Sequence, residues 1–161
     1  MFGCRVIYRG GLPRPLILSL IGVGWPPRLL LSKRGRNLVK KADRKAKAFA
    51  LAAAGTAASR RCSDIVVLDL RSISPATDYF VIVTGTSDRQ MRTVADEICE
   101  AAKKQGMQRF GRAGYEQARW ILLDFIDVVI HIFDSEYRDY YDLELLWGDA
   151  KRLKWDRTLK K

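Results

Sequence analysis

Two groups of residues in this sequence have types and spacing that could support chemistry. Residues 85–87 (GTS) come directly before a segment with helical spacing, and the N-terminus of a helix can bind phosphate. The carboxylates of Asp69, Asp124 and Asp127 could hold divalent cations for phosphoryl transfer if the fold brought them together. Neither signal is specific, because the sequence has no glycine-rich fingerprint, no P-loop lysine and no Asp-x-Asp after that turn.

The other reactive side chains are few. His131 is the single histidine, so any histidine-based metal site or nucleophile pair would depend on it, and a structural role is the preferred interpretation. Cys4, Cys62 and Cys99 are odd in number and far apart, which fits neither a disulfide framework nor a metal-binding spacing. The sequence therefore favours a reducing compartment and indicates no cofactor.

The longest strand-like run is WILLDFIDVVIHIF, from Trp120 to Phe133. Its β-branched and aromatic residues flank a short acidic segment, which predicts a β-hairpin. If residues 125 and 126 form the loop, the predicted pairs are Leu123 with Val128, Leu122 with Val129, Ile121 with Ile130 and Trp120 with His131.

The two faces of this hairpin differ, because residues that pair across it point to the same side. One face is aliphatic and suits a core: Ile121, Leu123, Val128, Ile130 and Ile132. The other mixes aromatic, aliphatic and acidic side chains: Trp120, Leu122, Asp124, Asp127, Val129, His131 and Phe133. Such a mixture is typical of a recognition surface, and a helix that covers this face is the alternative.

The chain is basic, with 29 Lys and Arg against 18 Asp and Glu and a formal net charge of +11. Such a charge normally indicates a nucleic-acid partner. Residues 1–42 hold nine of the cations and no carboxylate, which leaves 20 cations against 18 carboxylates in residues 43–161. Residues 43–161 are therefore nearly neutral, which argues against nucleic-acid binding by the whole chain.

We expect residues 1–42 to be a basic leader without regular structure. Its apolar run, Leu16 to Trp25, is too short to cross a bilayer as a helix, so no membrane partner is expected. An arginine-rich, acid-free start is also typical of a transit peptide. A non-native leader, a transit peptide and an rRNA-contacting tail remain alternatives. The expected location is the cytoplasm, or a mitochondrion or plastid if the leader is a transit peptide.

The rest of the chain predicts a compact α/β domain over residues 43–148, with a mixed β-sheet of about five strands and packed helices. The expected elements are a helix over 43–60, strands over 64–70 and 78–84, a helix over 87–105, a short strand over 107–110, the hairpin, and a helix from 134 or 135 to 147. Ser87 and Gln90 have the spacing of a capping box. Residues 149–161 are interpreted as a basic, mobile C-terminal tail.

Three separated motifs carry a resemblance to a known family. They are DIVVLDLRSISPATDYFVIVTGTSDRQM, the hairpin WILLDFIDVVIHIF and the closing YYDLELLWGDA, together covering about residues 64–149. In this order they resemble the ribosomal silencing factor, or iojap, family. Residues 1–42 lie outside the resemblance.

The resemblance implies a nucleotidyltransferase-like sheet in a protein that is not an enzyme. Such factors bind protein fourteen of the large ribosomal subunit, block subunit joining and repress translation when nutrients are scarce. The proposed contact residues of the family map onto Trp120, Leu122 or Leu123, Asp124, Tyr140, Tyr141 and Trp147. Asp78 and Tyr79 match a motif with a mainly structural role. A homodimer and a secondary contact of the basic tails with rRNA stay open.

Two positions depart from the family pattern. Ile126 stands where the family usually has glycine, so either the turn differs or Ile126 is strained, because a two-residue hairpin turn often needs positive φ. Ala113 stands where the family often has an acidic residue before Gly114, so one polar contact is expected to be missing.

Two functions are weighed against each other. A non-catalytic binding protein needs only a surface with aromatic and aliphatic anchors and a few orienting charges, which the mixed hairpin face supplies. A nucleotidyltransferase-like enzyme acting on a nucleotide or RNA needs closely placed carboxylates, and the fold alone does not imply that function. The first is preferred.

Overall fold

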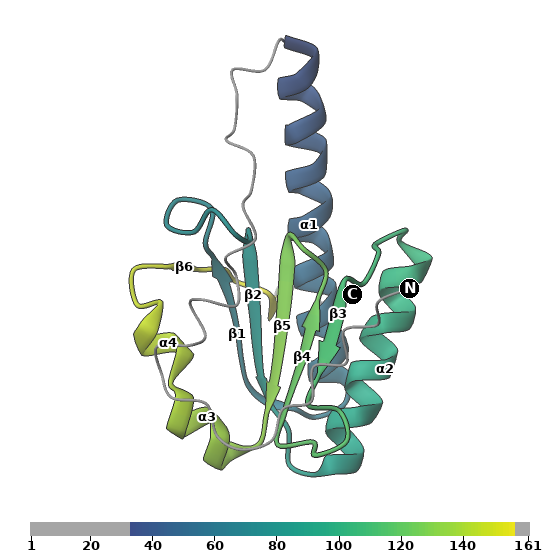
Figure 1. Ribbon diagram of the computed structural model, residues 1–161, viewed down its shortest axis with the longest axis vertical. Helices are drawn as coiled ribbons and strands as arrows, with labels where there is room; N and C mark the ends of the chain where they lie inside the picture. The colour runs from purple at the N-terminus through teal and green to yellow at the C-terminus, as the bar shows by residue number, and fades with distance from the viewer. Residues whose placement is uncertain (1–32, 157–161) are drawn as a thin grey trace, which may run out of the picture.

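A computed structural model of the chain describes residues 33–156, with side chains described from residue 42 onward. Most of the expected leader, residues 1–32, lies outside the described part. The described chain is a mixed β-sheet with helices on both faces (Figure 1), which confirms the predicted α/β class.

Six strands form the sheet in the order β3-β4-β5-β2-β1-β6. They are β1 (Ser63–Asp69), β2 (Tyr79–Thr84), β3 (Gly111–Ala113), β4 (Trp120–Asp124), β5 (Val128–Phe133) and β6 (Lys151–Arg152). β2 and β5 pair in parallel, and the other neighbours are antiparallel. The prediction of a strand over 107–110 is wrong. The Met107 amide donates to the Ala102 carbonyl at the end of a helix, and the pairing of β3 starts only at Gly111.

Two long helices, α1 (Lys33–Ser59) and α2 (Asp88–Lys104), cover one face of the sheet (Figure 1). α1 begins at Lys33 rather than at residue 43, so part of the expected leader is helical. The packing face of α1 consists of one aromatic and several small side chains, all buried: Ala46, Phe49, Ala50, Ala53, Ala54 and Ala57. The aliphatic hairpin face lies against these helices and is fully buried, as predicted: Ile121, Leu123, Val128, Ile130 and Ile132.

The N-terminus of α2 has the predicted cap, since the Ser87 hydroxyl accepts a hydrogen bond from the Gln90 amide. The Gln90 side chain reaches one residue further back than a standard capping box and accepts from the Thr86 amide at 2.7 Å. Together these bonds fix the turn between β2 and α2.

Two short helices, α3 (Ser135–Tyr141) and α4 (Leu143–Leu146), cover part of the opposite face. The prediction of a single closing helix is wrong. Asp142 adopts the left-handed conformation with φ +39°, which ends α3, and its side chain accepts from the Leu145 amide and caps α4.

Residues 149–156 belong to the folded domain, so the expected mobile tail is wrong for this segment. β6 pairs with the edge strand β1, and the Leu153 amide donates to the Val67 carbonyl at 2.8 Å. The Trp155 indole donates to the Ile65 carbonyl at 2.9 Å. The segment orders because it satisfies the otherwise open edge of β1 and packs Leu153 and Trp155 against the core. Across residues 33–156, no helix has both the length and the apolar character to cross a membrane.

Candidate partner-binding surface

The β4–β5 hairpin forms where the sequence predicted it, but its register differs. Trp120 pairs with Phe133, Leu122 with His131 and Asp124 with Val129, so the loop residues are Ile126 and Asp127 rather than 125 and 126. Phe125 leaves the loop because its ring is buried against Phe49, with the centroids 4.8 Å apart. The pairing moves by an even number of residues, so the side chains of β4 and β5 stay on their predicted faces, while Asp127 moves into the loop.

Ile126 sits at the tip of this hairpin with φ +70°. The Asp127 amide donates to the Phe125 carbonyl at 2.9 Å, which closes a three-residue turn centred on Ile126. Both alternatives for this position are therefore true: the turn differs from the prediction, and a β-branched residue occupies a conformation that favours glycine.

The mixed face of the hairpin meets the closing helices in a cluster of aromatic rings. The Trp120 ring centroid lies 5.0 Å from that of Phe133 and 4.6 Å from that of Tyr141. Tyr140 stands edge-on to Tyr141 at 5.1 Å. Four side chains of this region pack on one core cluster: Trp120, Val129, Tyr141 and Trp147. With Leu122 and Asp124, on the same face of β4 as Trp120, and the exposed Tyr140, they make up what we call the aromatic surface.

Gly114 supports the position of Trp120. It has φ +71°, and a Cβ at this residue would lie 1.9 Å from the Trp120 carbonyl oxygen. Glycine is required here both for the backbone conformation and for the close approach of the loop to the start of β4.

His131 lies beneath this surface and has a structural role. Its Nδ1 accepts a hydrogen bond of 3.3 Å from the Trp120 indole, and its ring meets Phe80 edge-on at 4.7 Å. Burial lowers the pKa of His131 to about 3, so the imidazole is neutral at physiological pH. Its Nε2 has no hydrogen-bond partner among the described residues. The ring orients Trp120 and is not accessible as a base.

The predicted contact residues differ in exposure. Tyr140 is 64% exposed, whereas Trp120, Leu122, Tyr141 and Trp147 are half-buried. Leu123 is 0% exposed and points into the core, so of the pair Leu122 and Leu123 only Leu122 presents its side chain on the aromatic surface. Asp124 is partly exposed, and its carboxylate caps the hairpin turn.

Sequence reasoning missed Leu145 and Leu146, both exposed on α4 next to Trp147. The sequence did contain a signal for them, because the closing segment has more apolar residues than one packing face of a helix can bury. The break at Asp142 decides which of them turn outward.

Carboxylates flank the aromatic surface on the side of α3 and α4. Residues 134–149 hold six of them and a single cation, Arg138. Arg119 pairs with Asp134 at 2.7 Å and with Glu136, and its guanidinium lies over the Tyr137 ring at 4.5 Å from the centroid. The flank of the surface formed by α3 and α4 is therefore acidic, which suits a basic partner.

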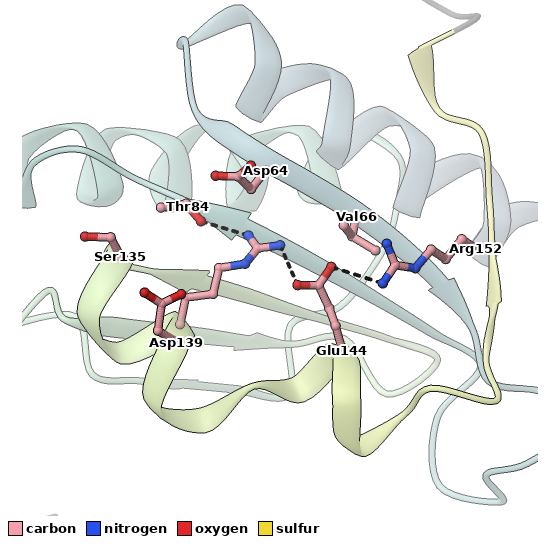
Figure 2. A pocket seen from close by; sticks show the side chains of 8 residues that line it. Asp64, Val66, Thr84, Ser135, Asp139, Glu144 and Arg152 are labelled. Atoms are coloured by element: carbon pink, nitrogen blue, oxygen red, sulfur yellow. Dashed lines mark hydrogen bonds and ion pairs between the residues drawn. The ribbon is translucent and has the colours of Figure 1, made fainter.

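A pocket of about 450 Å³ separates α3 and α4 from β1 and β2 (Figure 2). The Arg138 side chain, 11% exposed, donates to the Thr84 hydroxyl at 2.8 Å and pairs with Glu144 at 3.0 Å. Arg152 lies 3.7 Å from the same carboxylate. These contacts join α3 to β2, α4 and β6, and so hold Tyr141 of α3 against the hairpin.

The candidate catalytic carboxylates either form ion pairs with other side chains or lie far apart. Asp69 forms two hydrogen bonds with the Arg71 guanidinium, at 2.8 and 2.6 Å, and that side chain lowers the pKa of Asp69. Asp69 ends β1 and Asp124 ends β4, with β2 and β5 between them, so the convergence of carboxylates that the enzyme alternative requires does not occur.

The turn at residues 85–87 is also engaged in internal contacts. The Gly85 amide donates to the Phe133 carbonyl at 2.8 Å, and the Thr86 amide donates to Gln90. These two amides are therefore not available to a phosphate. Within residues 33–156, no group of three or more His, Cys, Asp or Glu side chains could hold a metal ion.

Comparison with known proteins shows what this chain is similar to. The family model described as ribosomal silencing factor during starvation matches residues 42–161. The chain is 45% identical over 98 residues to ribosomal silencing factor RsfS of Bacillus subtilis, covering 61% of this chain and 83% of the relative. It is 32% identical over 108 residues to chloroplastic protein Iojap of Zea mays, covering 67% of this chain and 47% of the relative.

A solved structure shows the same fold. The crystal structure of a Chromobacterium violaceum protein superposes with a TM-score of 0.59 at 31% identity, covering 65% of this chain and 85% of that one. The chain belongs to the family of ribosomal silencing factors, which regulate translation and are not enzymes.

Proposed function

We propose that this protein binds the large ribosomal subunit through its protein fourteen and sterically blocks association with the small subunit, repressing translation under nutrient limitation. Family membership supports the ribosomal role. The observation that carries the proposal is the contact of Trp120 with Tyr141 at 4.6 Å, because it unites two separate sequence motifs in one partly exposed surface.

The aromatic surface has the physical features that a protein interface needs. Packed aromatic rings supply apolar area at a low entropy cost, since Trp120 and Tyr141 are already ordered by their neighbours. The carboxylates around them would orient a basic partner and speed its association. No step of this mechanism requires a reactive group.

We assign the contact to side chains of the aromatic surface: Trp120, Leu122, Asp124, Tyr140, Tyr141 and Trp147. Leu123 supports the surface from the core and does not reach a partner with its side chain. For location we propose the cytoplasm, with a mitochondrion or plastid as the alternative if residues 1–42 are a transit peptide. Relatives named as chloroplastic and mitochondrial proteins support keeping that alternative.

The test is co-sedimentation of the full chain with purified large subunits, followed by an assay of subunit joining on sucrose gradients. Tyr140→Ala removes an exposed ring and is expected to weaken binding at least tenfold, because interface aromatic residues commonly contribute about 2 kcal/mol or more. Ile73→Ala removes an exposed apolar side chain in the β1–β2 loop and is the matched control. A folded protein that leaves subunit joining unaffected at saturating concentration contradicts the proposal.

A further inference from the structure

The N-terminal half of α1 carries a dense positive charge. Residues 33–47 contain eight Lys and Arg side chains and one carboxylate, Asp43, which lies 3.9 Å from Arg71. Among the described side chains of this segment, Arg44, Lys45 and Lys47 are exposed.

A second basic segment lies beside it. The end of α2 and the loop that follows expose Lys103, Lys104 and Arg109, and the sequence has no carboxylate between Glu100 and Glu116. The ammonium group of Lys45 donates to the Gly106 carbonyl at 3.1 Å, which joins α1 to this loop. We call residues 42–47 and 103–110 together the basic end.

The basic end also presents an exposed aromatic ring. Phe110 is 77% exposed, the largest exposed fraction among the large apolar side chains of the described residues. Its amide donates to the Asp124 carbonyl at 2.8 Å, which anchors the backbone while the ring stays accessible. A free ring among cations is the arrangement that stacks on unpaired bases.

Charge is segregated across the sheet. α1 and α2 lie on the face opposite α3 and α4, and Figure 1 shows the first turns of α1 projecting beyond the sheet at the end where α2 finishes. The acidic helices border the aromatic surface on one face, whereas the cations of the basic end come from α1, α2 and the loop after α2 on the other face. Phe110 lies between them, at the edge of the sheet next to Asp124. One molecule can therefore contact a basic protein and a polyanion at the same time.

We propose that the basic end binds RNA, with its Lys and Arg side chains on the phosphate backbone and Phe110 stacked on an unpaired base. The choice of RNA rests on the proposed function, since a protein held on the large subunit lies close to rRNA. A membrane surface fits less well, because a helix that lies in a bilayer interface needs a free apolar face. The apolar face of α1 is buried in the core.

The experiment uses the full chain and two fluorescein-labelled RNAs, a 20-nucleotide oligouridine and a duplex of equal length, in fluorescence anisotropy titrations over a range of KCl concentrations. Arg44→Glu, Lys103→Glu and Lys104→Glu are combined in one variant. It should bind oligouridine at least tenfold more weakly, with a salt slope smaller by about 2, because each lost phosphate contact on a single strand removes about 0.7 from the slope. The glutamine version of the variant provides a second measurement if the glutamate version does not fold.

A matched control reverses three exposed cations away from the basic end: Arg89→Glu, Lys151→Glu and Lys154→Glu. The net charge change is the same, and the expected loss of affinity is under twofold. Phe110→Ala should weaken binding to oligouridine about fivefold or more and leave duplex binding unchanged, since stacking requires an unpaired base.

Three results overturn the inference. They are equal loss in both triple variants, no measurable RNA binding at low salt, and tighter binding to phosphatidylglycerol vesicles than to RNA. Because the isolated RNAs contain no protein fourteen, Tyr140→Ala should retain full RNA affinity. The RNA titrations can therefore contradict this inference without bearing on the proposed function, which the large-subunit assay tests.

Discussion

The carboxylate of Asp124 accepts a hydrogen bond of 2.7 Å from the backbone amide of Ile126, the residue with φ +70° at the tip of the β4–β5 hairpin. This bond holds a β-branched residue in a conformation that ordinarily favours glycine. The same carboxylate lies at the edge of the aromatic surface, so the turn and the candidate interface depend on one side chain.

Replacing Ile126 with glycine should stabilise the protein. Ile126 is 42% exposed, so glycine would lose only part of the burial of an isoleucine, while release of the left-handed strain is worth about 1 kcal/mol. Urea unfolding should show a higher midpoint for Ile126→Gly. Asp124→Ala should be less stable than the native chain by about 1 kcal/mol, since the Ile126 amide loses its acceptor. A lower midpoint for Ile126→Gly would mean that the turn is not strained.

The neighbours Leu122 and Leu123 provide a matched pair of substitutions. Leu123→Ala leaves a cavity in the core and should lower the free energy of unfolding by about 2–5 kcal/mol. Leu122→Ala removes a half-buried side chain from the aromatic surface, so it should weaken large-subunit binding with a stability loss of only about 1 kcal/mol. Thermal melts and co-sedimentation separate the two effects. Unchanged affinity of folded Leu122→Ala would exclude Leu122 from the contact.

Acid should destabilise the fold through His131. Its pKa is about 3 in the folded state against 6.5 for a free histidine, so the unfolded chain binds a proton that the native protein excludes. The free energy of unfolding is therefore unaffected by the titration of His131 above pH 6.5 and falls as the pH decreases from 6.5 toward 3. The full slope from one proton is about 1.4 kcal/mol per pH unit.

The measurement is urea unfolding of the native chain and of His131→Phe between pH 7.5 and 5. Between pH 7.5 and 5 the native chain should lose about 2 kcal/mol more than the variant, which keeps an aromatic ring but no titratable group. Parallel pH dependence in the two proteins would show that His131 is not the group responsible.

Residues 149–156 should contribute measurably to stability. Trp155→Phe keeps a ring against the core and loses the hydrogen bond to the Ile65 carbonyl, so we expect a loss of about 1 kcal/mol. Trp155→Ala also loses the packing, and about 3 kcal/mol is expected. Differential scanning calorimetry distinguishes the two variants. A mobile segment would make both substitutions silent.

The sequence alone determined the features that depend on local periodicity. Alternation along residues 120–133 separated a core face from a mixed face, and that separation holds because the pleat alternates whatever the exact register. Ser87 marked the start of α2 because a capping side chain acts on amides within three residues. The three motifs were sufficient to identify the family, since they need only residue types and order.

Tertiary structure decided everything that depends on distant partners. The hairpin register follows from burial of Phe125 against Phe49, and β6 orders because the edge of β1 lacks another partner. The break at Asp142 ends α3 directly after Tyr141, whose ring lies against Trp120, and starts α4, on which Leu145 is exposed. Such outcomes balance local preference against contacts far apart in the chain, and pattern reading within one segment cannot weigh that balance.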